Sequence, residues 1–224
     1  MFPYFGKKQR HAKDYPAPEY SIVIEPFAGS MGYTMFHRPD KALGIDADSR
    51  VVELWHRGVD MGLSGRLPDP PVVGSRTDDL FVKLCSYSEH ALTSGTMTVT
   101  TRMVRDWGTV TTRMAEAGRW SNKHVEYMHG TYSDAPDIEA TWFIDPPYQK
   151  ANRRGYKHRS IDFSVLAEFC RSRRGQVIVC EQSGADWLPF HPLYDLGSHR
   201  GSKSTEVIWT QNPSIKRMRK GNNR

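Results

Sequence analysis

The stretch TWFIDPPY (Thr141–Tyr148) decides the fold predicted for this chain. Its first four residues, TWFI, are β-branched or aromatic and are typical of a buried β-strand. The two prolines cannot continue a central strand, so we expect the strand to end before them and the following turn to be rigid. An acidic side chain, a carbonyl group and an aromatic ring should therefore lie at the carboxyl end of a strand, where open α/β sheets bind ligands.

A second informative stretch lies near the start of the chain. Ser21–Glu25 is predicted to form a buried strand, Pro26–Gly32 a tight glycine-containing turn, and Ala42–Asp46 a second strand. A helix is expected between turn and strand, at about Met31–His37. Strand, glycine turn, helix and a strand that ends in an acid about 20 residues on are the pattern of a nucleoside-binding βαβ unit.

Asp46 is the acid of that unit and the candidate for binding ribose hydroxyls. The alternative is that Asp46 caps the next helix, a role that Asp48 can also fill. By itself the glycine pattern is weak, because Gly29 and Gly32 do not complete GxGxxG. The DPPY motif downstream strengthens the prediction of a nucleoside-binding unit.

Two motifs carry a resemblance to a known family. EPFAGS (Glu25–Ser30) and DPPY (Asp145–Tyr148) resemble the cofactor and catalytic motifs of S-adenosylmethionine-dependent amino-methyltransferases, above all the Dam-type DNA N6-adenine methyltransferases. That family places an N-terminal cofactor-contacting segment first, then the cofactor loop, a target-recognition insert and the catalytic motif. Pro3–Lys7 resembles the first of these segments. At Met31 the chain departs from the family, which usually has a second glycine there.

The resemblance implies the organisation of the chain. Residues 1–55 and 120–212 are the predicted methyltransferase core, 56–119 a small helical insert for target recognition, and 213–224 a basic tail. The implied fold is Rossmann-like α/β, with a mostly parallel seven-stranded sheet and a C-terminal antiparallel hairpin.

The remaining elements are predicted from periodicity and from turn residues. Residues 1–20 are expected to be an extended arm, and the glycine- and proline-rich residues 58–74 a loop. Further helices are expected at about 49–56, 80–84, 103–117 and 162–169, and further strands at about 124–128, 141–145, 176–181, 193–197 and 205–210.

The resemblance assigns catalysis to Asp145, Pro146, Pro147 and Tyr148. An adenine amine is a poor nucleophile, because its lone pair is delocalised into the ring. The Asp145 carboxylate and the Pro146 carbonyl are expected to accept hydrogen bonds from the two N–H groups of the amine. The negative charge of Asp145 is expected to stabilise the nitrogen as it becomes cationic. With an ordinary pKa of about 3.9, Asp145 would be ionised at pH 7. Tyr148 is expected to stack on a flipped or unpaired base, the alternative being a core or turn position.

The resemblance also implies a site for S-adenosylmethionine, with S-adenosylhomocysteine as product. Glu25 and the loop backbone would line the methionine part, Asp46 the ribose and Tyr132 the adenine. Phe5 and Lys7 would reach the cofactor or the phosphate backbone, unless Lys7 is simply exposed. The predicted cofactor site thus comprises Phe5, Lys7, Glu25, Pro26, Phe27, Ala28, Gly29, Ser30, Asp46, Tyr132 and Asp145.

Basic side chains gather next to the catalytic motif. The chain of 224 residues has a formal net charge of +6, and residues 149–160 contain no acid. This position favours a polyanionic substrate, because each phosphate contact releases counterions. The alternative is a solvated surface run. The predicted nucleic-acid-binding residues are Lys150, Arg153, Arg154, Lys157, Arg159, Arg102 and Arg105.

Several classes of function are not supported by the sequence. The three cysteines form neither a disulfide framework nor a CxxC pair, and the nine histidines show no metal-ligand spacing, so no metal site is predicted. No GxSxG motif is present, which argues against a serine hydrolase. Without a signal peptide or an apolar run of about 18 residues, we expect no membrane contact and a location in the cytoplasm of a bacterial or phage-infected cell.

Three functions remain open on these grounds. The first is methylation of adenine N6 in DNA, which the motif order and the length of the insert favour. The second keeps the cofactor and changes the acceptor to RNA or to cytosine N4. The third is a catalytically inactive nucleic-acid-binding relative, which the departure at Met31 allows. The recognition sequence and the oligomeric state are not predicted.

Overall fold

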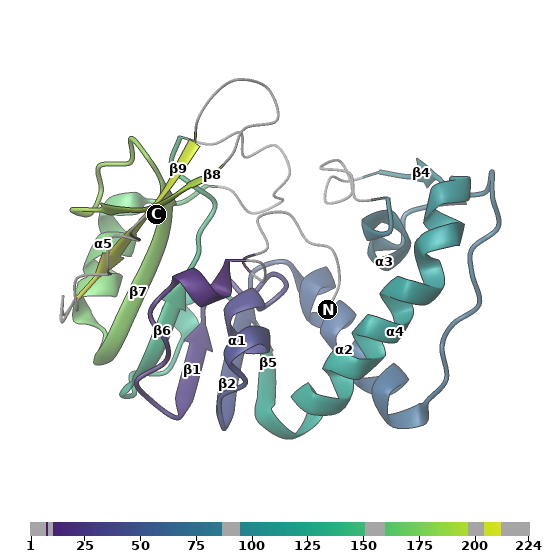
Figure 1. Ribbon diagram of the computed structural model, residues 1–224, viewed down its shortest axis with the longest axis horizontal. Helices are drawn as coiled ribbons and strands as arrows, with labels where there is room; N and C mark the ends of the chain where they lie inside the picture. The colour runs from purple at the N-terminus through teal and green to yellow at the C-terminus, as the bar shows by residue number, and fades with distance from the viewer. Residues whose placement is uncertain (1–7, 9–10, 87–94, 151–159, 197–203, 212–224) are drawn as a thin grey trace, which may run out of the picture.

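The computed structural model describes residue 8 and residues 11–86, 95–150, 160–196 and 204–211. A seven-stranded sheet forms its centre, in the order β5-β2-β1-β6-β7-β9-β8 (Figure 1). The strands are β1 Ile22–Glu25, β2 Lys41–Asp46, β5 Val125–His129, β6 Ala140–Ile144, β7 Gly175–Gln182, β8 His191–Leu196 and β9 Ser204–Thr210.

The directions of the strands confirm the predicted Rossmann-like sheet. β5, β2, β1, β6 and β7 pair in parallel, and β9 is antiparallel to both β7 and β8. β8 therefore runs with the parallel strands, and β9 runs against them. From β1 the chain winds outward to β2 and β5, then returns to β6 on the other side of β1. The order of the strands reverses direction between β1 and β6. Such a topological switch point is where open α/β sheets bind ligands.

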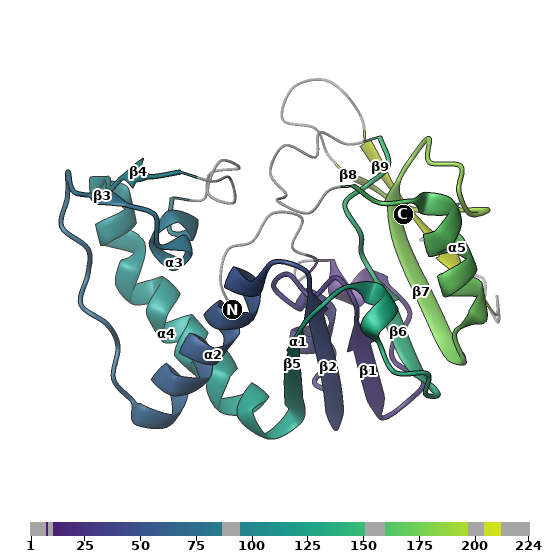
Figure 2. The same ribbon diagram turned by 180° about the vertical axis from the view of Figure 1, so that it is seen from behind.

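Short helices cover both faces of the sheet. α1 (Gly32–His37) and the 3-10 turn η1 (Ala12–Asp14) lie on one face, and α5 (Phe163–Ser172) lies on the other (Figures 1 and 2). Alternation along the strands explains this, because neighbouring residues point to opposite faces. Val23 thus joins the core on the α1 side, whereas Ile24 joins the core with α5.

The sequence predicts an extended N-terminal arm, but the arm is not extended along its whole length. Ala12–Asp14 form the turn η1, and Ala12 and Tyr15 are buried. The Tyr15 ring packs edge-on against Phe143 of β6, with 5.1 Å between ring centroids. Burying this ring on the sheet bends the arm, and the prediction from composition could not include that contact.

The predicted loop at 58–74 is wrong for its first part. α2 runs over Ser49–Ser64 and ends at Gly65, which has the positive φ typical of a helix C-terminus. Gly58 and Gly62 lie inside this helix, where it crosses α4 (Thr101–His124). A Cβ added to Gly62 would lie 2.5 Å from the Ala115 carbonyl oxygen of α4. These glycines therefore permit a close approach of two helices and do not form a turn.

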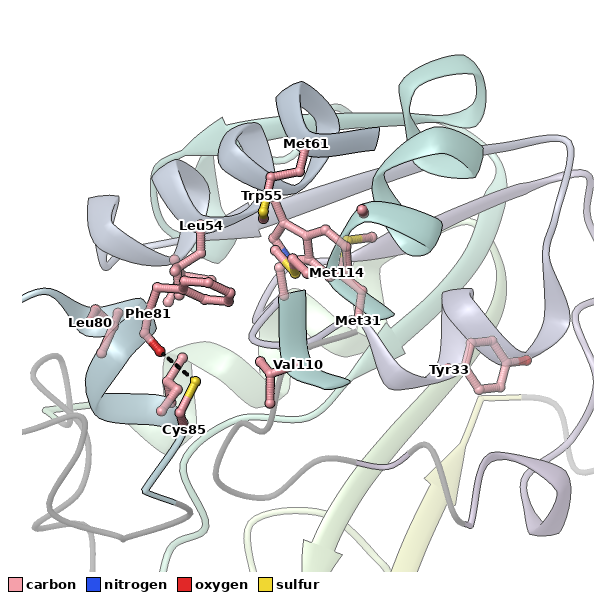
Figure 3. Packing of buried hydrophobic residues seen from close by; sticks show 14 of the residues in the cluster. Met31, Tyr33, Leu54, Trp55, Met61, Leu80, Phe81, Cys85, Val110 and Met114 are labelled. Carbon is pink, nitrogen blue, oxygen red and sulfur yellow. Dashed lines mark hydrogen bonds between the residues drawn. The ribbon is translucent and has the colours of Figure 1, made fainter. Parts of the chain in front are cut away.

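The insert adds a short helix and a small second sheet. α3 is Leu80–Leu84, and β3 (Arg76–Thr77) pairs antiparallel with β4 (Met97–Thr98). Both expected domain limits, 55/56 and 119/120, fall inside α2 and α4. Figure 3 shows Trp55 of α2 beside Met114 of α4, in the buried cluster that also contains side chains of the sheet. No helix in the described part of the chain is long and apolar enough to cross a bilayer.

Met31 occupies a backbone conformation that glycine adopts more readily than other residues. It precedes α1 with φ 46° and ψ 48°, in the left-handed region, and its side chain is fully buried. Its sulfur packs on Gly44 of β2, where an added Cβ would lie only 2.6 Å away. The burial of the Met31 side chain thus offsets the strain of its left-handed backbone.

We therefore expect Met31→Gly to be more stable than Met31→Ala by about 1 kcal/mol, although alanine is ordinarily the more stable of the two. Both variants lose the Met31 side chain beyond Cβ, so the difference between them reports mainly the left-handed backbone. Urea unfolding of the two variants measures this difference. A more stable alanine variant would contradict the left-handed assignment.

Candidate active site

The glycine loop Pro26–Gly32, which is predicted to bind the cofactor and is called the cofactor loop below, meets the DPPY motif at the switch point. β1 ends at Glu25 and β6 at Ile144, and because these strands are parallel neighbours both ends lie at one edge of the sheet. Asp145 follows directly, as the sequence predicts. The two carboxyl groups lie close enough for Asp145 to raise the pKa of Glu25. The predicted catalytic and cofactor-binding segments are therefore neighbours.

Asp145 is a largely buried carboxylate with a cationic partner. Its side chain is 19% exposed, and its Oδ1 lies 2.9 Å from Nζ of Lys8. Burial raises the pKa of Asp145 to about 6; Lys8 opposes the shift and Glu206 adds to it. The ordinary pKa expected from the sequence is thus wrong, because the strand end is desolvated. Asp145 nevertheless remains mostly ionised at pH 7.

Lys8 is a residue of this site that sequence reasoning missed. It is 8% exposed, donates a hydrogen bond to the Tyr148 hydroxyl, and lies 3.4 Å from Oε1 of Glu206. Burial alone would lower the pKa of Lys8, but Asp145 and Glu206 outweigh it, so the pKa is raised and the ammonium form is held. The predicted residues Phe5 and Lys7 lie outside the described residues. The sequence marks this segment but does not single out Lys8.

Glu206 of β9 is the second missed residue. It is 2% exposed, and its Oε1 accepts hydrogen bonds from the hydroxyls of Tyr148 at 2.6 Å and Tyr15 at 2.7 Å. Burial raises the pKa of both tyrosines, so both hydroxyls stay protonated donors. The sequence offers one signal, an acid within the otherwise apolar strand TEVIWT.

The chain that leaves the motif is held by β7. Pro146 and Pro147 are buried. The backbone N–H of Gln149 donates to Oε2 of Glu181 at 2.9 Å, and Nε1 of Trp187 donates to the same oxygen at 3.0 Å. Glu181 is fully buried and was not predicted as a site residue. It fixes the direction in which the motif continues.

Asp46 holds the cofactor loop in place. Its Oδ2 accepts the backbone N–H of Gly29 at 2.9 Å, and its Oδ1 that of Asp48 at 2.9 Å. Gly29 has φ 45°, so it is one of the positions where glycine is favoured. Asp48 caps α2, with its side chain accepting from the N–H of Arg50. The sequence leaves open whether Asp46 or Asp48 caps the helix, and the structure gives this role to Asp48. A ribose bound by Asp46 would contact a carboxylate that also accepts the Gly29 N–H.

Two further predicted cofactor residues have distinct surroundings. Glu25 is 3% exposed and its Oε1 accepts the N–H of Thr34 at 2.8 Å. Burial raises the pKa of Glu25 to about 8, so this carboxyl is mostly neutral at pH 7. The half-buried rings of Phe27 and Tyr132 stack with 5.6 Å between centroids. The aromatic pair, the Asp46 carboxylate and the glycine loop lie at a switch point. Together these groups fit a nucleoside.

The predicted nucleic-acid-binding residues are only partly within the structure. Lys150 is exposed beside Gly184. Arg102 and Arg105 project from α4 and both pair with Asp106, at 3.7 Å and 2.9 Å. Arg153, Arg154, Lys157 and Arg159 lie outside the described residues. Across the part of the chain that is described, no three His, Cys, Asp or Glu side chains gather as metal ligands do.

No family model and no curated protein matches the sequence. Among solved structures, the chain is similar to the rRNA methyltransferase aviRa from Streptomyces viridochromogenes, with 14% identity, a TM-score of 0.41, and coverage of 91% of this chain and 81% of that one. A likeness at this identity and TM-score assigns neither an activity nor a substrate.

Proposed function

We propose that this protein transfers a methyl group from S-adenosylmethionine to the N6 amine of adenine in DNA. One observation carries the proposal: the DPPY motif after β6 and the glycine loop after β1 flank the switch point of the sheet. A fixed carboxylate, a carbonyl and an aromatic ring then lie beside a site that fits a nucleoside.

The residues around the loop suit the proposed cofactor. When bound, S-adenosylmethionine supplies a methyl group on a positively charged sulfur. Phe27 and Tyr132 would contact its adenine, Asp46 its ribose hydroxyls, and the backbone of Gly29–Ser30 its methionine part. A neutral Glu25 beneath the loop would not add a second negative charge beside Asp145.

Asp145 would act by orientation and by charge. Its carboxylate accepts one N–H of the target amine, and the Pro146 carbonyl accepts the other, which directs the nitrogen lone pair away from the ring. The nitrogen becomes positively charged as its bond to the methyl carbon forms and the carbon–sulfur bond breaks. The buried carboxylate stabilises this charge and then accepts the amine proton for release to solvent.

The target base would be held by Tyr148. Its ring is half-buried at the edge of the site, and a base inside a duplex must leave its stack to reach it. Lys150, Arg102 and Arg105 are placed on the surface as candidates for phosphate contacts. Contacts of this kind would make binding weaken steeply with salt.

The test is an assay of purified protein with isotopically labelled S-adenosylmethionine and duplex DNA, single-stranded DNA or structured RNA. Products are digested to nucleosides and identified by mass. We expect N6-methyladenine in DNA. A methylated base in RNA, or N4-methylcytosine, would overturn the assigned acceptor but not methyl transfer. Cofactor binding without a product would point to an inactive relative, and absence of cofactor binding would overturn the proposal.

The rate of methyl transfer is expected to depend on Asp145 ionisation. Because the pKa of Asp145 is about 6 and the carboxylate is the active form, kcat/KM should be constant above pH 7 and fall as the pH drops through 6. The residual rate of Asp145→Asn should lack this acid limb. A wild-type profile that stays flat down to pH 4.5 would contradict the assigned role.

A further inference from the structure

We propose that Glu206 is a positioning residue for Asp145 and Tyr148. The inference rests on the proposed function and extends it to β9, a strand outside both motifs. It is drawn from the way three donor groups, two on the N-terminal arm and one in the DPPY motif, converge on one carboxylate oxygen.

Oε1 of Glu206 is that oxygen. It accepts the Tyr148 hydroxyl at 2.6 Å and the Tyr15 hydroxyl at 2.7 Å, and Nζ of Lys8 lies 3.4 Å away. Two hydroxyl donors and an ammonium beside one oxygen stabilise the negatively charged form of a carboxyl group. Glu206 is therefore an acceptor and a negative charge inside the protein.

The first consequence is orientation. Tyr15 is anchored by its edge-on contact with Phe143, so its hydroxyl fixes Glu206 from the core side. Glu206 in turn holds the Tyr148 hydroxyl, and with it the far end of the ring. A ring held at its far end presents one defined face to an incoming base, which lowers the entropy lost on stacking.

The second consequence is charge. Lys8 lies between two carboxylates, at 2.9 Å from Asp145 and 3.4 Å from Glu206. One ammonium and two carboxylates leave one negative charge in excess. Lys8 and Asp145 alone would be neutral. The proposed reaction brings a cationic cofactor next to a nitrogen that becomes cationic, so the excess negative charge from Glu206 stabilises the transition state.

The test compares Glu206→Gln with the wild-type protein. Glutamine keeps the shape and a carbonyl acceptor but removes the charge. We expect kcat to fall about 10- to 100-fold, with KM for DNA and the Kd for S-adenosylmethionine changed less than about threefold. The acid limb of the pH profile should move to lower pH, because the Glu206 charge raises the pKa of Asp145.

A second readout does not require activity. In protein labelled with 13C at the Asp side-chain carboxyl and free of cofactor, the NMR titration of Asp145 should move to lower pH in Glu206→Gln. Tyr194→Phe is the matched control. The Tyr194 hydroxyl lies 3.3 Å from the Tyr15 hydroxyl, which itself donates to Glu206, so Tyr194 is linked to Glu206 only through Tyr15. This variant should leave both the rate and the Asp145 titration unchanged.

The outcomes separate this inference from the proposed function. Wild-type kcat in Glu206→Gln, or a loss of rate that follows the loss of folded protein while the acid limb stays in place, would overturn the positioning role. If wild-type protein methylates no nucleic acid, the proposed function fails. The Asp145 titration then still decides: a shift to lower pH supports the link to Glu206, and an unchanged titration overturns it.

Discussion

Replacing Asp145 with alanine is expected to lower the rate of methyl transfer by at least about 1000-fold and to change cofactor affinity by less than about threefold. The carboxylate would contact the target amine and not the cofactor, so its loss should appear in kcat. Single-turnover transfer and calorimetric titration with S-adenosylmethionine measure the two effects separately. A transfer rate within tenfold of wild type would contradict the catalytic assignment.

The same substitution should also destabilise the fold. Lys8 is buried and would lose its ion pair with Asp145 at 2.9 Å, while it would keep Glu206, at 3.4 Å, and the Tyr148 hydroxyl. The loss should be smaller than the ~3–5 kcal/mol of a buried charge left without a partner, because Glu206 still balances the charge of Lys8. The double variant Lys8→Met, Asp145→Ala should be less stable again, because the buried Glu206 carboxylate then lacks its ammonium partner, whereas both variants are inactive. Loss of activity and loss of folding can thus be told apart.

A nearby acid provides the matched control for Asp145. Asp186 is exposed and accepts a hydrogen bond from the Gln149 side chain at 3.0 Å, just beyond the DPPY motif. Its charge lies at the surface and has no part in the buried network. Asp186→Asn should therefore keep the wild-type rate within about threefold, since exposed charges interact weakly through water. A large loss in this variant would mean that the assay responds to general surface charge.

The sequence predicted the sheet because local rules govern its strands. Runs such as Val23–Ile24 and Trp142–Ile144 are apolar and end at proline or acid, so the strand ends could be placed to within a residue or two. DPPY and Asp46 therefore come to the expected edge of the sheet. The pairing of the last two strands followed from their short connection.

The partners of the motif could not be predicted in the same way. Lys8 and Glu206 are 198 positions apart, from 8 to 206, and meet only because the arm crosses the sheet beside β9. Local patterns carry no information about such a contact. The raised pKa of Asp145 has the same origin, since it depends on burial. Gly58 and Gly62 were misread because glycine at a helix crossing and glycine in a loop look alike along a single chain.

That crossing gives the largest expected effect on stability. A Cβ added to Gly118 of α4 would lie 1.9 Å from the Gly58 carbonyl oxygen and 2.6 Å from the Val59 nitrogen, both in the backbone of α2. No side-chain rotation relieves a clash with backbone, so the two helices must move apart and lose packing around Trp55 and Met114. We expect Gly118→Ala to lower the free energy of unfolding by about 3 kcal/mol or more.

Gly108 allows the same chemical change in the same helix without the clash. It is exposed, and an added Cβ would have nothing within 4 Å. Gly108→Ala should therefore raise the free energy of unfolding by about 0.5–1 kcal/mol through helix propensity. Urea unfolding of the two variants measures effects of opposite sign. Equal effects would mean that α2 and α4 do not touch at Gly118.

The consequence of Gly118→Ala should extend to the cofactor loop. Nε1 of Trp55, on α2, donates to the Gly29 carbonyl at 3.1 Å, so a displaced α2 pulls on the turn that Asp46 holds from the other side. We expect Gly118→Ala protein that remains folded to bind S-adenosylmethionine about fivefold more weakly, because one turn hydrogen bond is worth about 1 kcal/mol. Gly108→Ala should bind it as wild type does. Weakened binding in both variants would place the cofactor elsewhere than at this loop.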